Sequence, residues 1–132
     1  MDYVPEVTPE HVLRIIRRDF PQEDALLVLS ELNQYGHEPW QPEQDRVRLA
    51  ILKLSRGDLD QLRRFVTVAQ RDYRDVLASA ECPRAFTAAF SRDTHADAAR
   101  LAELAQADWQ QYQIWLASAE YCGGPQDALV AR

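Results

Sequence analysis

Residues 43–82 read EQDRVRLAILKLSRGDLDQLRRFVTVAQRDYRDVLASAEC, and this stretch decides the fold. Two apolar patterns with helical spacing meet at Arg56-Gly57-Asp58, with no further residue between them. Gly57 is suited to end the first helix in the left-handed conformation. The Asp58 carboxylate can cap the second helix by accepting from its first free N–H groups, with Gln61 at the capping-box position. The junction therefore predicts two helices joined by a tight turn.

The two halves of this hairpin carry different apolar patterns. Residues 43–55 are apolar around most of the helix circumference, which is typical of a helix buried on several sides. Residues 59–81 instead carry one narrow stripe at helical spacing. The stripe consists of Leu59, Leu62, Phe65, Val66, Ala69, Tyr73, Val76, Leu77 and Ala80. An αα-hairpin of residues 43–55 and 59–81 is thus predicted at the centre of the molecule.

Helical signals continue on both sides of the hairpin. Thr8 with Pro9 predicts the start of a first helix, which Pro21 ends after Phe20. A second helix follows and closes near Gly36, before a loop that contains two prolines.

The last helix is predicted from Thr94, with Asp97 at the capping-box position, to about Tyr121. Between the hairpin and this helix, residues 83–93 fit either a loop or a short helix around Phe86 to Phe90. The class is all-α, a compact bundle of about five helices, with a single domain at residues 1–125 and a mobile tail at 126–132.

Length and composition limit the class of protein. The chain has 132 residues, 46% of them hydrophobic, which suits one domain with one core. The N-terminus shows no secretory signal, and no apolar run reaches the ~20 residues that a membrane span needs. Cys82 and Cys122 are too few for a disulfide framework and lack metal-ligand spacing. We expect a soluble cytoplasmic protein with reduced thiols.

The net charge of −6 is unevenly distributed along the chain. Residues 1–42 hold three basic and eight acidic side chains, whereas residues 43–75 hold eight basic and six acidic ones. Residues 76–132 hold four and seven. Proteins that bind nucleic acids usually show a stronger basic surface, so this acidic balance argues against DNA or RNA as the main partner.

Asp108 is the residue that fits its surroundings least. On the last helix it falls at the centre of an apolar arc that includes Tyr112 and Trp115, where an unpaired carboxylate would cost several kcal/mol. One interpretation is an internal ion pair or hydrogen bond to a neighbouring helix. The other is a ligand pocket at the bundle end, formed by Asp108, Tyr73 and Tyr112 with an Arg.

Several side chains are candidates for contact with a partner. Trp109 and Trp115 on the last helix fit either the core or a dimer or partner interface. Trp40 lies in the proline loop, where it either covers the end of the bundle or is offered to a partner. His37, followed by Glu38, is the only acid–base doublet in that loop.

Arginines on the second half of the hairpin allow two interpretations. Arg71 and Asp75 are four residues apart on a helix, and Asp60 can reach Arg63, so the surface fits a solvated, ion-paired face. The alternative is an anion or partner site built from Arg63, Arg71 and Arg74.

Motifs with defined chemistry are absent from the sequence. It contains no H-E-x-x-H, G-x-S-x-G, C-x-x-C or glycine-rich phosphate loop, so we assign no catalytic residue, no metal site and no cofactor. This absence favours a protein that is not an enzyme.

Residues 46–59, RVRLAILKLSRGDL, and residues 71–77, RDYRDVL, carry a resemblance. This pattern resembles a group of small uncharacterised bacterial all-helical proteins. The resemblance implies a bacterial cytoplasmic protein. It supplies no activity and no site residues.

The leading hypothesis is a non-enzymatic interaction protein, acting as an adaptor, regulator or immunity-type domain that binds a protein partner or a second copy of itself. It depends on the missing catalytic motifs and the surplus of aromatic residues. The first alternative is a small-molecule binder or unrecognised enzyme with a pocket around Asp108. The second is weak nucleic-acid binding through the arginine face of residues 59–81.

Overall fold

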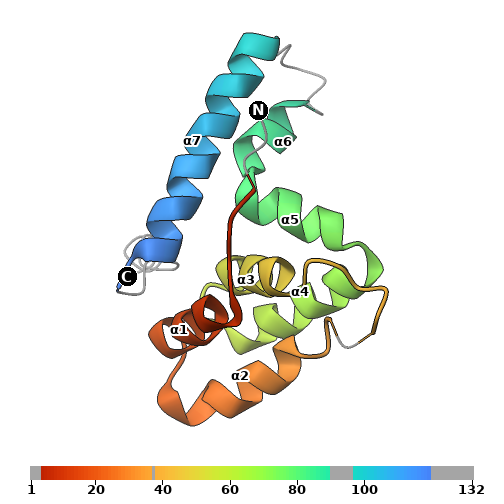
Figure 1. Ribbon diagram of the computed structural model, residues 1–132, viewed down its shortest axis with the longest axis vertical. Helices are drawn as coiled ribbons and strands as arrows, with labels where there is room; N and C mark the ends of the chain where they lie inside the picture. Colours follow the sequence, from red (N-terminus) through yellow and green to blue (C-terminus); the bar gives the residue numbers. More distant parts are fainter. Residues whose placement is uncertain (1–3, 37, 90–96, 120–132) are drawn as a thin grey trace.

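Helices form all of the regular structure in the described part of the chain (Figure 1). The computed structural model describes residues 4–36, 38–89 and 97–119. These ranges contain seven α-helices, a 3-10 helix and no strand. The elements are α1 (Pro9–Asp19), η1 (Gln22–Asp24), α2 (Ala25–Leu32), α3 (Gln44–Ser55), α4 (Leu59–Arg71), α5 (Tyr73–Glu81), α6 (Pro83–Ala89) and α7 (Ala98–Ala117). The all-α class is confirmed, whereas the predicted number of about five helices is wrong.

The helix α3 is the centre of the molecule, with α1, α4 and α5 packed around it. It carries more buried residues than any other described helix, namely Val47, Leu49, Ala50, Ile51, Leu52 and Ser55. Its all-round apolar pattern predicted this position, because a helix surrounded by neighbours has no solvent face to keep polar.

The turn between α3 and α4 follows the prediction with one difference. Asp58 caps α4, since its Oδ1 accepts from Gln61 N at 3.0 Å. The left-handed conformation begins one residue before the glycine, with φ of 51° at Arg56 and 75° at Gly57. The chain therefore needs two left-handed residues to reverse, and one of them is an arginine in a conformation that L-residues rarely adopt.

The predicted helix of residues 59–81 is wrong, because it is broken at Asp72. The backbone of Asp72 is extended (φ −153°, ψ 92°), so α4 ends at Arg71 and α5 begins at Tyr73. The Asp72 carboxylate accepts from Arg74 N at 3.1 Å and caps α5. This break turns α5 away from α4, and both helices pack against α3.

The N-terminal helices follow the predicted signals. Thr8 precedes Pro9 at the start of α1, and Thr8 N donates to His11 Nδ1 at 3.0 Å. The backbone at Phe20 is extended (φ −124°, ψ 151°), as expected before a proline. The second helix stops at Leu32, and turns lead from there to Gly36.

The helix α6 and the first half of α7 extend away from this body, with α6 beside the upper part of α7 (Figure 1), whereas the second half of α7 packs on the core. The short helix expected around Phe86 begins earlier, at Pro83, and Phe90 lies outside the described residues. The predicted start of the last helix at Thr94 is too early, because Asp97 has an extended backbone and α7 begins at Ala98. Asp97 caps α7 by accepting from Arg100 N at 2.8 Å, and Thr94 itself lies outside the described residues. The predicted end near Tyr121 is too late, because the helix ends at Ala117 and Ser118 is extended.

The length and hydropathy of the described helices also bear on the membrane prediction. Not one of the helices in the described ranges is both long enough and apolar enough to cross a bilayer. The predicted tail at 126–132 lies outside the described residues.

Candidate functional site

The Asp108 carboxylate caps a helix other than its own. Its side chain is 2% exposed, and Oδ2 accepts from the backbone N of Arg84 and of Ala85, both at 3.0 Å. The Arg84 Nε lies 3.8 Å from Oδ1. These N–H groups belong to the first turn of α6, whose donors have no partner within their own helix. Asp108 thus fits the interpretation of an internal hydrogen bond that ties α7 to its neighbour.

Tyr112 lies one turn further along α7 and is also buried. Its hydroxyl has no hydrogen-bond partner among the described residues. Burial, and then the negative charge of Glu81, raise the pKa of Tyr112 well above its ordinary value, whereas Arg46 lowers it. The phenol therefore stays protonated in the physiological range, which removes it as a general base.

Tyr73 does not join Asp108 and Tyr112. It is the first residue of α5, whereas Asp108 bonds to α6, which follows the last residue of α5. Tyr73 lies near Tyr35, whose pKa is raised to about 12 by burial first and then by Tyr73. The three ligand candidates are thus distributed over two regions of the molecule.

An apolar groove lies between α6 and α7, and we call it the α6–α7 groove. It has a volume of about 670 Å³ and is lined by Cys82, Ala85, Phe86, Ala89, Leu101, Ala102, Glu103, Ala105 and Gln106. Asp108 is not among these lining residues. Seven of the nine are apolar or a thiol, and Glu103 is the only one of these described residues that is ionised.

The walls of the α6–α7 groove are not covered by the rest of the described molecule. The helix α6 contains no buried residue, although five of its seven residues are apolar. On α7 all four buried residues fall in the second half, from Asp108 to Leu116. The first half of α7 and the whole of α6 thus project an apolar surface beyond the core.

The two tryptophans of α7 have different surroundings. Trp115 is buried in the core, with the Arg18 guanidinium 5.2 Å from its ring centroid and the Tyr112 ring 5.4 Å away. Trp109 is half-buried and follows Ala105 by four residues, so it lies on the flank of α7 that borders the groove. Trp115 fits the core interpretation, while Trp109 lies at the edge of an exposed apolar surface.

Two of the three arginine candidates, Arg63 and Arg74, are paired with acidic neighbours. Arg63 Nε lies 3.3 Å from Glu31 and Nη1 lies 3.9 Å from Asp60. Arg74 Nε lies 3.3 Å from Asp72, and Arg71 is exposed at the end of α4. The break at Asp72 places Arg71 and Arg74 on different helices, so they do not extend one continuous helix face with Arg63.

Trp40 is 74% exposed, so it does not cover the end of the bundle. Its loop is fixed by other side chains. Gln41 Oε1 accepts from Gly36 N at 2.8 Å and from Glu38 N at 3.0 Å, and the Tyr35 hydroxyl donates to Pro42 O at 2.8 Å. His37 lies outside the described residues.

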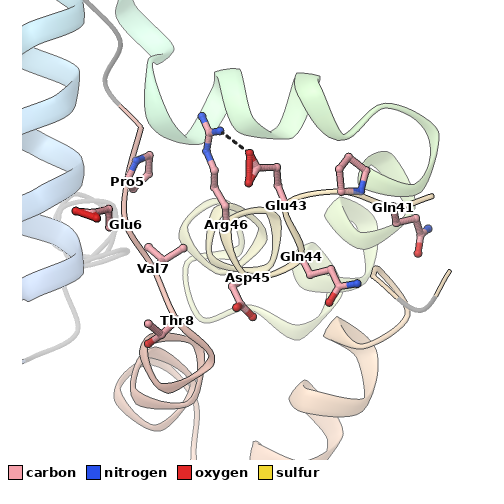
Figure 2. A pocket seen from close by; sticks show the side chains of 10 residues that line it. Pro5, Glu6, Val7, Thr8, Gln41, Glu43, Gln44, Asp45 and Arg46 are labelled. Atoms are coloured by element: carbon pink, nitrogen blue, oxygen red, sulfur yellow. Dashed lines mark hydrogen bonds and ion pairs between the residues drawn. The ribbon is translucent and has the colours of Figure 1, made fainter. Parts of the chain in front are cut away.

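A second groove borders this loop, and we call it the acidic groove (Figure 2). Its volume is about 770 Å³, and it lies between the extended residues 5–8 and residues 41–46 at the start of α3. Figure 2 shows the Arg46 side chain directed toward Glu43. Glu6, Glu43 and Asp45 line the groove, while Arg46 is bound by Glu81 with Nε–Oε2 and Nη2–Oε1 distances of 2.8 and 2.6 Å.

Within the described ranges, no group of three His, Cys, Asp or Glu side chains is arranged to hold a metal ion. Burial, followed by the charges of Glu81 and Asp108, raises the pKa of the Cys82 thiol. That thiol therefore remains protonated and weakly nucleophilic.

Sequence reasoning missed the α6–α7 groove. Leu101 and Ala105 belong to the same apolar arc of the last helix as Tyr112 and Trp115, and the pattern of that arc fits either the core or an interface without indicating a groove. The available signal was size: the first half of the arc holds Leu101 and Ala105, whereas the second half holds Tyr112 and Trp115. Small side chains fill little core volume, so the first half had less to bury.

Comparison with protein-family models, with characterised proteins and with solved structures finds no match. The geometry of the described residues is accordingly the basis for the function proposed below.

Proposed function

We propose that this protein is a non-enzymatic binding module that docks an amphipathic helix of a protein partner into the α6–α7 groove. The observation that carries the proposal is the groove itself: an apolar depression of about 670 Å³ with one wall, α6, that buries none of its residues. Exposed apolar surfaces of this kind are typical of interaction sites. The same surface gives no support to a pocket enzyme, because Asp108 faces the backbone of α6.

A helix is the occupant that fits the shape of the groove. Two helices form its walls, and four of the nine lining residues are alanines, which leave a shallow channel for a third helix. A partner helix can place apolar side chains at positions i, i+3, i+4 and i+7 along such a channel. Phe86 and Leu101 provide the larger contacts on either wall.

Charge favours a basic partner over a second copy of this chain. The net charge of −6 makes two copies repel each other, and the ionised residue of the described lining is Glu103, which is 70% exposed. Arg100 lies 3.5 Å from Glu103, but both side chains are exposed, so this ion pair is weak and easily exchanged. Lysine or arginine at the edge of the partner helix would pair with Glu103.

The test uses a labelled 18-residue model peptide of Leu and Lys with leucines at the amphipathic spacing. Its affinity is measured by fluorescence anisotropy for the wild-type protein and for Ala102→Arg, which fills the groove. The matched control is Ser30→Arg, which adds the same charge at an exposed position on α2. We expect Ala102→Arg to weaken binding at least tenfold and Ser30→Arg to leave it within about twofold.

Cys82 gives a second readout, because its thiol lines the groove. In a Cys122→Ser background, bound peptide should slow the alkylation of Cys82. If Ala102→Arg and Ser30→Arg lose the same affinity for the peptide, the binding is unspecific charge attraction, and the proposal is overturned. A wild-type solution mass of twice 15.2 kDa, together with a monomeric mass for Ala102→Arg, would show that a second copy of the chain occupies the groove and would overturn the proposal of a helical partner.

A further inference from the structure

One wall of the α6–α7 groove is a helix that is too short to be stable alone. The helix α6 has seven residues, and although it packs against α7 and α5, it buries none of them. Isolated helices shorter than about 12 residues are unstable in water, because nucleation of a helix is unfavourable. The contacts that keep α6 folded therefore decide whether the groove has its second wall.

The sequence around the start of α6 provides no cap of its own. Cys82 precedes the helix, and a thiol is a poor acceptor for the free N–H groups of a first turn. The first turn contains no acidic residue. Pro83 and the alanines of α6 favour a helix, but seven residues are too few for propensity alone to hold it.

The missing cap comes from the opposite wall of the groove. The Asp108 carboxylate of α7 accepts from Arg84 N and from Ala85 N, both at 3.0 Å. Its side chain is 2% exposed and is not among the residues that line the groove. Asp108 thus joins the two walls from behind, where an occupant of the groove does not reach it.

From this arrangement we infer that Asp108 is a positioning residue for docking, which sets the affinity of the α6–α7 groove for its helical partner by keeping α6 folded. The inference rests on the docking function proposed above. A protein whose binding-competent form is only partly populated binds with an affinity reduced by that fraction. Loss of the cap increases the population in which α6 is unfolded and the groove has one wall. Because linkage is reciprocal, a bound helix also stabilises α6.

Asp108→Asn is the first test, since it keeps the size of the side chain and a neutral acceptor. We expect this variant to bind the labelled Leu–Lys peptide about three- to tenfold more weakly than the wild type, and Asp108→Ala to bind it more weakly still. Amide hydrogen exchange of residues 84–89 should accelerate in free Asp108→Asn, and saturating peptide should slow it again.

The matched control is Asp72→Ala, which removes the cap of α5 at a position outside the groove. It lowers the global stability without affecting α6, so the peptide should bind it within about twofold of the wild type. Equal losses of affinity in Asp72→Ala and Asp108→Asn would show that global stability is the cause and would overturn the inference.

Thr87→Ala tests whether Asp108 acts through α6 or through its charge. Thr87 is exposed on α6 and does not line the groove, and alanine is the better helix former. In the Asp108→Asn background, Thr87→Ala should restore about threefold of the lost affinity. In the wild type, whose α6 is already folded, it should change the affinity by less than about 1.5-fold.

The outcomes separate this inference from the docking function. Equal peptide affinity of wild type and Asp108→Asn would overturn the inference and leave the docking function standing. Failure of Thr87→Ala to restore any affinity would do the same, because Asp108 would then act through its charge. A wild type that shows slow exchange at residues 84–89 and no peptide binding would overturn the docking function, and this inference with it.

Discussion

The Asp108 carboxylate accepts hydrogen bonds from the free backbone N–H groups in the first turn of a helix other than its own. A capping residue normally precedes the helix that it caps, but this carboxylate reaches across from α7 to Arg84 N and Ala85 N. The helix α6 has seven residues and buries none of them, so its packing against α7 and α5 remains partly open to solvent. The Asp108 side chain is a buried anchor of α6 and of the groove wall that α6 forms.

Truncation of Asp108 should unfold α6 and lower the global stability. Asp108→Ala removes two charge-assisted hydrogen bonds, and we expect a loss of about 2–3 kcal/mol in the free energy of unfolding by urea. Asp108→Asn keeps a neutral acceptor and should lose about half of that. Amide hydrogen exchange of residues 84–89 should accelerate in the alanine variant.

Glu103→Ala is the control for this prediction, since it removes an exposed acid from the same helix and should stay within about 0.5 kcal/mol of the wild type. Unchanged stability in Asp108→Ala would contradict the capping role.

At the residue scale, the sequence shows that Asp108 is an unusual residue on an apolar helix face, but it does not identify the groups that bind its carboxylate. Periodicity placed Asp108 on the apolar side of its helix, and the structure buries it. The partner groups are backbone amides 23 and 24 positions earlier, in a segment that fitted either a loop or a helix. A backbone donor carries no side-chain signature, so sequence patterns could not identify it.

Among the elements, the boundary between α4 and α5 shows how a cap can override a continuous apolar stripe. The stripe runs through Val66, Ala69, Tyr73 and Val76 at helical spacing, so periodicity predicts one helix. Asp72 nevertheless adopts an extended backbone and caps the second segment. The signal was present in the sequence as an Asp with a second Asp three residues later, a pattern typical of a helix start.

Replacement of Asp72 should destabilise the protein at this boundary. Asp72→Ala removes the hydrogen bond to Arg74 N and the ion pair to its guanidinium, both at exposed positions, so we expect a loss of about 1 kcal/mol. Urea unfolding monitored by circular dichroism measures it. Asp60→Ala, an exposed acid within α4, should change the stability by less than half as much, and equal effects would show that Asp72 acts only through its charge.

Some helix starts were predictable from local rules. The caps at Thr8 and Asp58 need only three or four consecutive residues, whereas the last helix was expected from Thr94 and begins at Ala98, with Asp97 as its cap. The end of α7 at Ala117 follows no such local rule, because its last carbonyls are satisfied by side chains from α1.

At the scale of the whole molecule, α1 clamps the end of α7. Arg18 Nη1 donates to Trp115 O at 2.6 Å and to Ser118 O at 3.0 Å, and Arg14 donates to Leu116 O and Ser118 O. The Arg18 and Asp19 side chains are 3% and 1% exposed and lie 2.6 Å apart. This buried cluster anchors the core end of α7, so its other half can project with α6.

Loss of Arg18 should release this clamp. Arg18→Ala leaves the Asp19 charge buried without a counter-ion and frees the α7 carbonyls, so we expect about 3–5 kcal/mol of destabilisation in urea unfolding. Arg18→Lys keeps the charge without the planar stacking on Trp115 and should be intermediate. Arg17→Ala, at the exposed neighbouring position, should have little effect, and a similar loss there would argue against a specific clamp.

The clamp also sets the order of events during synthesis. Arg18 and Trp115 are 97 positions apart, and at about 5–20 residues per second the ribosome needs roughly 5–20 s to add the intervening chain. During that interval the nascent helices α1 to α5 can assemble, while Arg18 and Asp19 still lie in water. Until the end of α7 has been synthesised, helices α1 to α5 therefore lack the contacts between Arg18 and α7, and they remain accessible to chaperones and proteases.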